Sequence, residues 1–271
     1  MKVDAYLRRI GAERPGPTDI GNLRRLQRHH LESVPFENLG AHLDEQIDLG
    51  SPALFDKIVQ RRRGGLCYEL NGAFAMLLRE LGYTVQLLGA RVRGRDGRLG
   101  PPLDHLALRV DLDVPWLVDV GFGRFSISPL RLDVREPQDD PDGRFLLREA
   151  PRGDLDVTRD GVVVYRLETR PRELGEFDAK AWWHSTSPRS PFTRGPLCSR
   201  LTPGGRITLA GRRLIEISDA GRSERDLTGD AAVVAAYRRY FGFEIDRPPE
   251  PRPRNPREKE IHLNDRLPYS G

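Results

Sequence analysis

The sequence contains little cysteine and no long apolar run, and each shortage excludes a class of protein. Two cysteines in 271 residues cannot form the disulfide framework of a small secreted protein. The longest apolar stretches, such as 73–78 and 116–120, are far shorter than the roughly 20 residues that cross a bilayer. The first four positions already contain charged residues, and no apolar core of a secretory signal peptide follows them. We therefore expect a soluble, cytoplasmic protein with reduced cysteines and no membrane partner.

Metal-binding and nucleotide-binding motifs are also missing. The sequence has no Cys-x-x-Cys and no His-x-x-x-His pair, so we predict no metal site. Gly64-Gly65 lacks the Gly-Lys-Ser/Thr continuation of a phosphate-binding loop. Gly121-Phe122-Gly123 does not continue into the dinucleotide-binding pattern either.

Positive charge is plentiful but dispersed. The net charge is +4, and only four of the 44 basic residues are lysine. The arginines alternate with 40 acidic residues along the whole chain, whereas a nucleic-acid footprint concentrates positive charge on one face. We therefore predict no nucleic-acid partner. The dense run at 61–63 and the net positive field are compatible with an anionic small-molecule ligand.

The order of hydrophobic patterns indicates helices first, then strands, then a small mixed α/β part. Helical patterns cover 19–33, 51–61, 67–81 and, near the end, 228–241; strand patterns cover 84–93, 105–111, 116–122, 145–149 and 162–167, and a hairpin covers 206–217. Regularly spaced short strands suggest a barrel or a sandwich. We predict loop connections over 132–144 and 182–192, and an extended segment along the surface, called the strap, over 246–256.

Cys67 is the strongest candidate for a reactive group. It follows Arg63-Gly64-Gly65-Leu66 at the predicted start of a helix, where partial positive charge and free amide donors stabilise a thiolate. The alternative is a small buried core cysteine. Cys198 has no comparable setting, and we expect it to be structural.

His105 and Asp119 are the candidate partners of Cys67, because a nucleophilic cysteine needs a base and the base needs an orienting group. An acidic residue inside the apolar run 117–121 is costly unless it has a partner. A turn centred on Leu112 would place His105 and Asp119 opposite each other on antiparallel strands, although a turn one residue later would misalign them. The other histidines are assigned to surface or packing: His29, His30, His42, His184 and His262.

Four sequence motifs together resemble the arylamine N-acetyltransferase family, bacterial type. They are Pro35-Phe36-Glu37-Asn38-Leu39, Arg63-Gly64-Gly65-Leu66-Cys67-Tyr68-Glu69-Leu70-Asn71-Gly72, Val118-Asp119-Val120-Gly121-Phe122-Gly123 and the Ser/Pro-rich 187–192. The resemblance implies an α+β fold. The expected fold would comprise an N-terminal helical bundle (1–83), a central antiparallel β-barrel (84–195) and a C-terminal α/β lid with a Pro/Arg-rich tail (196–271).

The same resemblance implies a function and a site. Acetyl-CoA would acylate Cys67, and an arylamine, arylhydrazine or N-hydroxyarylamine would then attack the thioester in a ping-pong reaction. Catalysis would use the triad Cys67, His105 and Asp119; Phe36 and Phe122 would line the acceptor pocket, and Arg63 and Glu69 would anchor the local turn. The sequence departs from the family motif at Leu70 and shows no counterpart of the mammalian coenzyme A loop, so no coenzyme A contacts are assigned.

Three alternatives remain open. On the same fold, an amide synthase of ansamycin-type polyketide biosynthesis would take an acyl chain onto Cys67 and close a macrolactam. A hydrolase or transglutaminase-like enzyme shares the Cys-His-Asp order. A non-enzymatic binding protein would not need Cys67.

Overall fold

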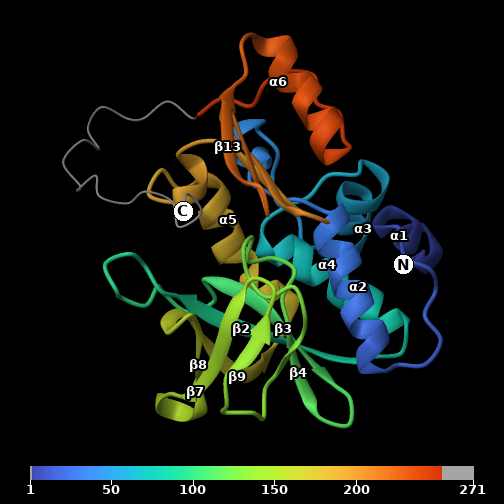
Figure 1. Cartoon of the computed structure of the whole chain (residues 1–271), viewed down its shortest axis with the longest axis vertical. Helices are drawn as coiled ribbons and strands as arrows, with labels where there is room; N and C mark the ends of the chain where they lie inside the picture. Colours follow the sequence, from blue (N-terminus) through green and yellow to red (C-terminus); the bar gives the residue numbers. More distant parts are fainter. Residues whose placement is uncertain (1, 252–271) are drawn as a thin grey trace.

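The computed structural model describes residues 2–251, and its N-terminal third is a group of helices (Figure 1). Asp19 caps α2 by accepting the Asn22 N–H at 2.7 Å, and Gly82, at a φ of 92°, follows the end of α4. The helical elements of this part are α1 (Val3–Ile10), α2 (Ile20–Ser33), η1 (Leu39–His42), α3 (Ser51–Phe55), the π-helix η2 (Asp56–Gln60) and α4 (Cys67–Glu80). Helix α4 lies at the centre, because its apolar residues pack into the main core with those of α1 and α2.

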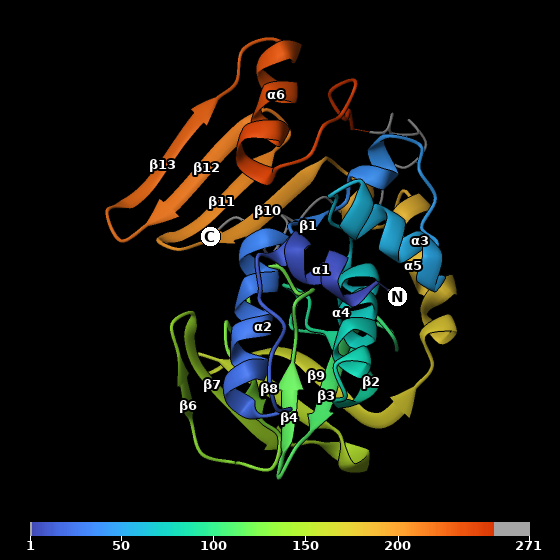
Figure 2. The same ribbon diagram turned by 90° about the vertical axis from the view of Figure 1, so that its right-hand side faces the viewer.

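The central part is an eight-stranded antiparallel sheet that curls into a nearly closed barrel beneath the helices (Figures 1 and 2). Strands β2 and β3 contact α4, which joins the barrel to the helical part. Its spatial order is β5-β4-β3-β2-β9-β8-β7-β6. The strands are β2 (Thr84–Val92), β3 (His105–Asp111), β4 (Pro115–Val118), β5 (Leu130–Arg131), β6 (Gln138–Asp140), β7 (Gly143–Glu149), β8 (Leu155–Arg159) and β9 (Val162–Arg172).

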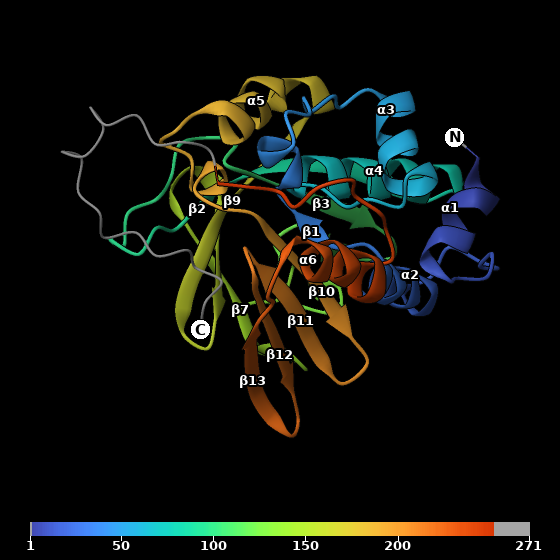
Figure 3. The same ribbon diagram turned by 90° about the horizontal axis from the view of Figure 1, so that it is seen from above.

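The C-terminal part is a second antiparallel sheet with a helix along one face (Figure 3). Strand β1 (Phe36–Glu37) lies at its edge against β10, so this sheet is attached to the helical part. Its other elements are β10 (Leu197–Thr202), β11 (Gly205–Ala210), β12 (Arg213–Ser218), β13 (Gly221–Asp226), α6 (Asp230–Ala236) and the π-helix η6 (Tyr237–Phe241). The order of helices, antiparallel barrel and α/β part confirms the predicted fold class.

Several local predictions were wrong. Segment 182–192 is not a simple connection, because α5 (Asp178–Thr186) occupies its first half. The strand predicted over 116–122 ends at Val118, and β6 lies in the loop predicted over 132–144. Of the predicted strap 246–256, the part beyond residue 251 lies outside the described residues, as does His262. Within residues 2–251 no helix has the length and apolar content that a bilayer span requires.

Candidate active site

Cys67 is the first residue of α4 and is only 6% exposed. The helix begins there because Leu66 is extended (φ −76°, ψ 170°) and the Glu69 carboxylate accepts the Leu66 N–H at 2.9 Å. Lys57 Nζ lies 2.6 Å from the other carboxylate oxygen of Glu69. Both carboxylate oxygens of Glu69 are therefore engaged at the turn that presents Cys67.

Two glycines allow the backbone to pass close to this turn. A Cβ atom on Gly64 would lie 1.8 Å from the Pro35 carbonyl oxygen, and one on Gly121 would lie 2.7 Å from the Cα atom of Cys67. Both distances are far below van der Waals contact, so only glycine fits at either position. Gly121 thus brings the chain that follows Asp119 directly against the start of α4.

His105 and Asp119 are in contact, but not through the predicted strand register. The pairs Leu108↔Val118 and Asp111↔Pro115 place the centre of the β3–β4 turn at position 113, one residue later than the turn predicted at 112. The side chains still meet, because β4 ends at Val118 and Asp119 leaves the ladder. His105 Nε2 lies 2.7 Å from Asp119 Oδ2, and both residues are nearly inaccessible to solvent.

Asp119 is held by residues that the sequence analysis missed. Asn71 donates to Asp119 Oδ1 at 2.9 Å, and the Gly121 N–H donates to the same oxygen at 2.9 Å. Tyr165 on β9 donates its hydroxyl to Asp119 Oδ2 at 3.5 Å. Asn71 could have been found from the sequence, because it lies one helical turn after Cys67 on the same face of α4. Nothing in the sequence indicates Tyr165.

The surroundings of His105 favour its charged form. Burial lowers its pKa, but the Asp119 carboxylate and the hydrogen-bonded Cys67 sulfur outweigh burial and raise the pKa of His105 to about 10. Since Nε2 is engaged by Asp119, Nδ1 is the ring nitrogen left for Cys67. The two ring nitrogens of His105 therefore connect Cys67 with Asp119, and both neighbours favour the charged imidazole.

Aromatic rings surround the Cys67–His105–Asp119 group. The Phe122 ring meets the His105 ring edge-on at 5.1 Å between centroids, and Tyr165 lies 5.4 Å from His105. Phe36, in β1, pairs with Gly65 across a parallel bridge and packs on Phe192 at 5.8 Å. The structure thus places Phe122 against the imidazole and Phe36 beside the turn that precedes Cys67.

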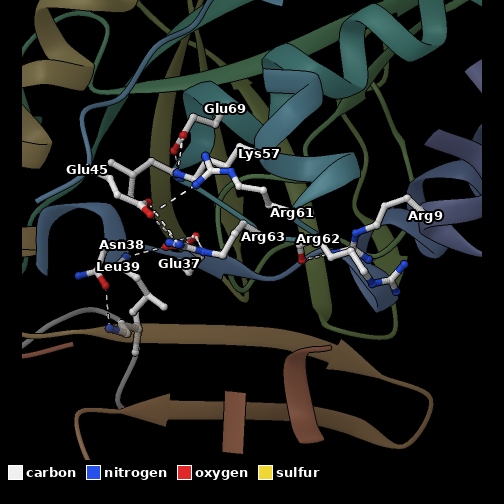
Figure 4. A network of polar contacts seen from close by, with 12 residues as sticks. Arg9, Glu37, Asn38, Leu39, Glu45, Lys57, Arg61, Arg62, Arg63 and Glu69 are labelled. Atoms are coloured by element: carbon white, nitrogen blue, oxygen red, sulfur yellow. Dashed lines mark hydrogen bonds and ion pairs between the residues drawn. The ribbon is translucent and has the colours of Figure 1, made fainter. Parts of the chain in front are cut away.

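Arg63 does not contact the Cys67–His105–Asp119 group; its side chain belongs to a buried ion network (Figure 4). Its Nη2 atom lies 2.8 Å from Glu37 Oε1, and its Nη1 atom lies 3.2 Å from Glu45 Oε1. Glu37 also accepts the Leu39 N–H at 2.6 Å, and the nearby positive charges lower the pKa of this carboxyl despite its burial. Arg63 therefore connects the turn before Cys67 to the segment after β1.

Replacing Arg63 by methionine is expected to lower the free energy of unfolding by about 3 kcal/mol, because it leaves the Glu37 carboxylate buried without its main partner. Urea denaturation measures this change. The matched control is Arg61→Met: Arg61 is exposed and pairs with Asp56, so its loss should cost less than about 1 kcal/mol. Equal effects of the two substitutions would contradict the structural role of Arg63.

Cys198 lies elsewhere, on β10. It is fully buried in the core between the C-terminal sheet and α6, and burial raises the pKa of its thiol. An apolar, buried thiol is unreactive, in agreement with a packing role.

Comparison with known proteins identifies the fold's relatives. An N-acetyltransferase family model matches residues 19–249. The arylamine N-acetyltransferase of Mycolicibacterium smegmatis is 36% identical, with 90% of this chain and 93% of the relative covered. A structure of the M. smegmatis enzyme has a TM-score of 0.81 at 35% identity, covering 90% of this chain and 93% of that one. The structure of Mycobacterium marinum arylamine N-acetyltransferase in complex with CoA has a TM-score of 0.79 at 33% identity, covering 89% and 93%.

Proposed function

The chain belongs to the arylamine N-acetyltransferase family of acyltransferases, and from this premise we propose a ping-pong reaction through a thioester on Cys67. The donor is acetyl-CoA, and the acceptor is the nitrogen of an arylamine, an arylhydrazine or an N-hydroxyarylamine. The observation that carries the proposal is the buried group of Cys67, His105 and Asp119, in which His105 interacts with both other side chains. The coenzyme A complex of the M. marinum relative supports the choice of donor.

In the first half-reaction the Cys67 thiolate attacks the carbonyl carbon of the acetyl thioester. A new carbon–sulfur bond forms to Cys67, the carbon–sulfur bond to coenzyme A breaks, and His105 gives its proton to the departing thiolate. Loss of the negative charge on Cys67 removes one of the two groups that raise the pKa of His105, so proton release is favoured at that moment.

In the second half-reaction neutral His105 accepts a proton from the attacking amine nitrogen. The bond between the acetyl carbon and Cys67 breaks, the amide leaves, and the thiolate–imidazolium pair returns. Asp119 orients the ring and stabilises its charge throughout. Phe36 and Phe122 offer apolar faces to a flat aromatic acceptor, and Arg63 and Glu69 hold the turn beneath Cys67.

Incubation with acetyl-CoA and no acceptor is expected to add one acetyl group to the protein, because the second half-reaction cannot proceed. Intact-mass analysis and peptide mapping should place the group on Cys67, and addition of an arylhydrazine should remove it. Failure to acylate with any acyl-CoA would contradict the proposal and favour an amide synthase supplied by a carrier protein. Cleavage of peptide or glutamine amides without acyl-CoA would favour a hydrolase or transglutaminase-like enzyme.

A further inference from the structure

Of the three consecutive arginines noted in the sequence, Arg61 and Arg63 both pair with Glu45, whereas Arg62 meets Arg9 through its backbone carbonyl (Figure 4). Arg61 pairs with Asp56 at 2.9 Å, and Arg63 pairs with Glu37. Arg62 between them has a left-handed backbone (φ 57°), an uncommon conformation for a residue with a side chain. Within residues 2–251 no carboxylate pairs with Arg62, so this guanidinium differs from its two neighbours.

Arg9 on α1 is a second cation that has no counter-charge among residues 2–251. It is only 5% exposed, and its guanidinium donates to three carbonyl oxygens, those of Ile58 at 3.0 Å, Ser33 at 2.8 Å and Arg62 at 2.9 Å. These dipoles hold the group in place without neutralising it. Burial and the nearby Arg62 lower the pKa of Arg9 to about 10, still well above neutral pH. A buried cation is costly without a counter-ion, so the site favours an anion.

Both arginines line a cavity of about 400 Å³ between α1 and η2, a volume within the range of small-molecule sites. In the described part of the chain none of its basic side chains forms an ion pair, and its lining includes no acidic residue. The nearby carboxylates are already taken, since Asp4 pairs with Arg14 and Asp56 with Arg61. The lining residues are Lys2, Ala5, Arg8, Arg9, Phe55, Val59, Gln60 and Arg62.

We propose that this cavity binds an organic phosphate, a function beyond the acyl transfer at Cys67. Guanidinium groups present several N–H donors in a plane and bind phosphate oxygens in pairs, which suits Arg8 and Arg62 at the exposed side of the cavity. Phe55 and Val59 add an apolar wall for a ring attached to the phosphate.

Isothermal titration calorimetry of the full chain with phenyl phosphate at low ionic strength tests the proposal. The wild type should bind one equivalent, and more tightly than inorganic phosphate because of the apolar wall. In the double variant Arg8→Gln/Arg62→Gln the dissociation constant should rise at least tenfold. Among residues 2–251 the double variant loses no ion pair, and the hydrogen bond it loses, from Arg62 Nε to the Gly242 carbonyl oxygen at 3.3 Å, is exposed, so it should fold normally. The control is Arg148→Gln, which removes an exposed arginine of β7 that has no ion pair within the described part of the chain, and it should leave binding unchanged.

Two further measurements identify the source of the phosphate. If it belongs to the acyl donor, coenzyme A will displace phenyl phosphate and the double variant will show a raised KM for acetyl-CoA. If it belongs to a separate metabolite, coenzyme A will not compete and the kinetics will be unchanged. Either pattern supports the site. No binding by the wild type, or equal binding by the double variant, would overturn it.

Discussion

Replacing Cys67 by alanine is expected to lower kcat/KM for acetyl transfer by roughly 10⁴-fold or more, because the covalent route is lost while the fold is kept. The sulfur is the acceptor of the acetyl group and also one of the two groups that raise the pKa of His105. The variant should therefore show no acetyl adduct by mass spectrometry and a lower His105 pKa by NMR titration. Its unfolding transition should stay close to that of the wild type, because alanine fills most of the same volume.

Cys198→Ala is the matched control, since it removes the other cysteine of the chain. Cys198 is buried on β10 in a separate core, so its loss should affect stability rather than turnover. The rate of inactivation by iodoacetamide should be the same in this variant and in the wild type. Loss of acyl transfer in Cys198→Ala together with its survival in Cys67→Ala would reverse the assignment of the nucleophile.

The setting of Cys67 was readable from the sequence because its determinants are local. A Gly-Gly break followed by a cysteine and a regular apolar pattern predicts a helix that begins near Cys67, and α4 begins there. The role of Glu69 at this turn came only from the family resemblance, because Leu66 is not a capping side chain; in the structure Glu69 accepts the Leu66 N–H. Lys57 as the partner of Glu69 comes from another helical element and has no comparable signal.

The contact between His105 and Asp119 was predicted for a reason that the structure does not support. The predicted symmetry about Leu112 is wrong, because the β3–β4 register is centred on position 113. A one-residue shift in register normally moves a side chain to the opposite face. Here β4 ends at Val118, so Asp119 need not follow the alternation of side chains between the two faces of the sheet. Its carboxylate therefore still reaches the His105 ring. Strand ends depend on tertiary contacts, in this case Asn71 and Gly121, which a pairing argument does not contain.

The fold class followed from the order of patterns, whereas elements with weak patterns did not. Strand β13 is exposed along its whole length and has no apolar alternation. Helix α5 begins before a Ser/Pro-rich stretch that conceals it, and it is fixed by contacts outside itself: Lys180 and His184 lie 2.9 and 3.3 Å from Asp104 Oδ1, directly before His105. Elements that are fixed by polar contacts with distant parts of the chain are therefore hard to predict from the local sequence pattern.

Replacing Asp119 by asparagine is expected to lower kcat by roughly 10³–10⁴-fold with little change in shape, as for a triad that loses its orienting carboxylate. In the wild type, burial lowers the pKa of His105 while Asp119 and Cys67 raise it to about 10. Removing the charge of Asp119 leaves burial opposed by Cys67 alone, so the pKa of His105 must fall. The alkaline limb of the kcat/KM profile should move to lower pH, and the NMR titration of the His105 ring should move with it.

Asp111→Asn is the control for this shift, because it makes the same substitution at the far end of β3, where Asp111 pairs with the part-exposed Arg109. Its pH profile should match that of the wild type. Reduced activity of Asp119→Asn with an unshifted alkaline limb would indicate a structural role for Asp119 only. Unchanged activity and an unchanged limb would show that the hydrogen bond at 2.7 Å does not take part in acyl transfer, and the base would then act without an orienting carboxylate.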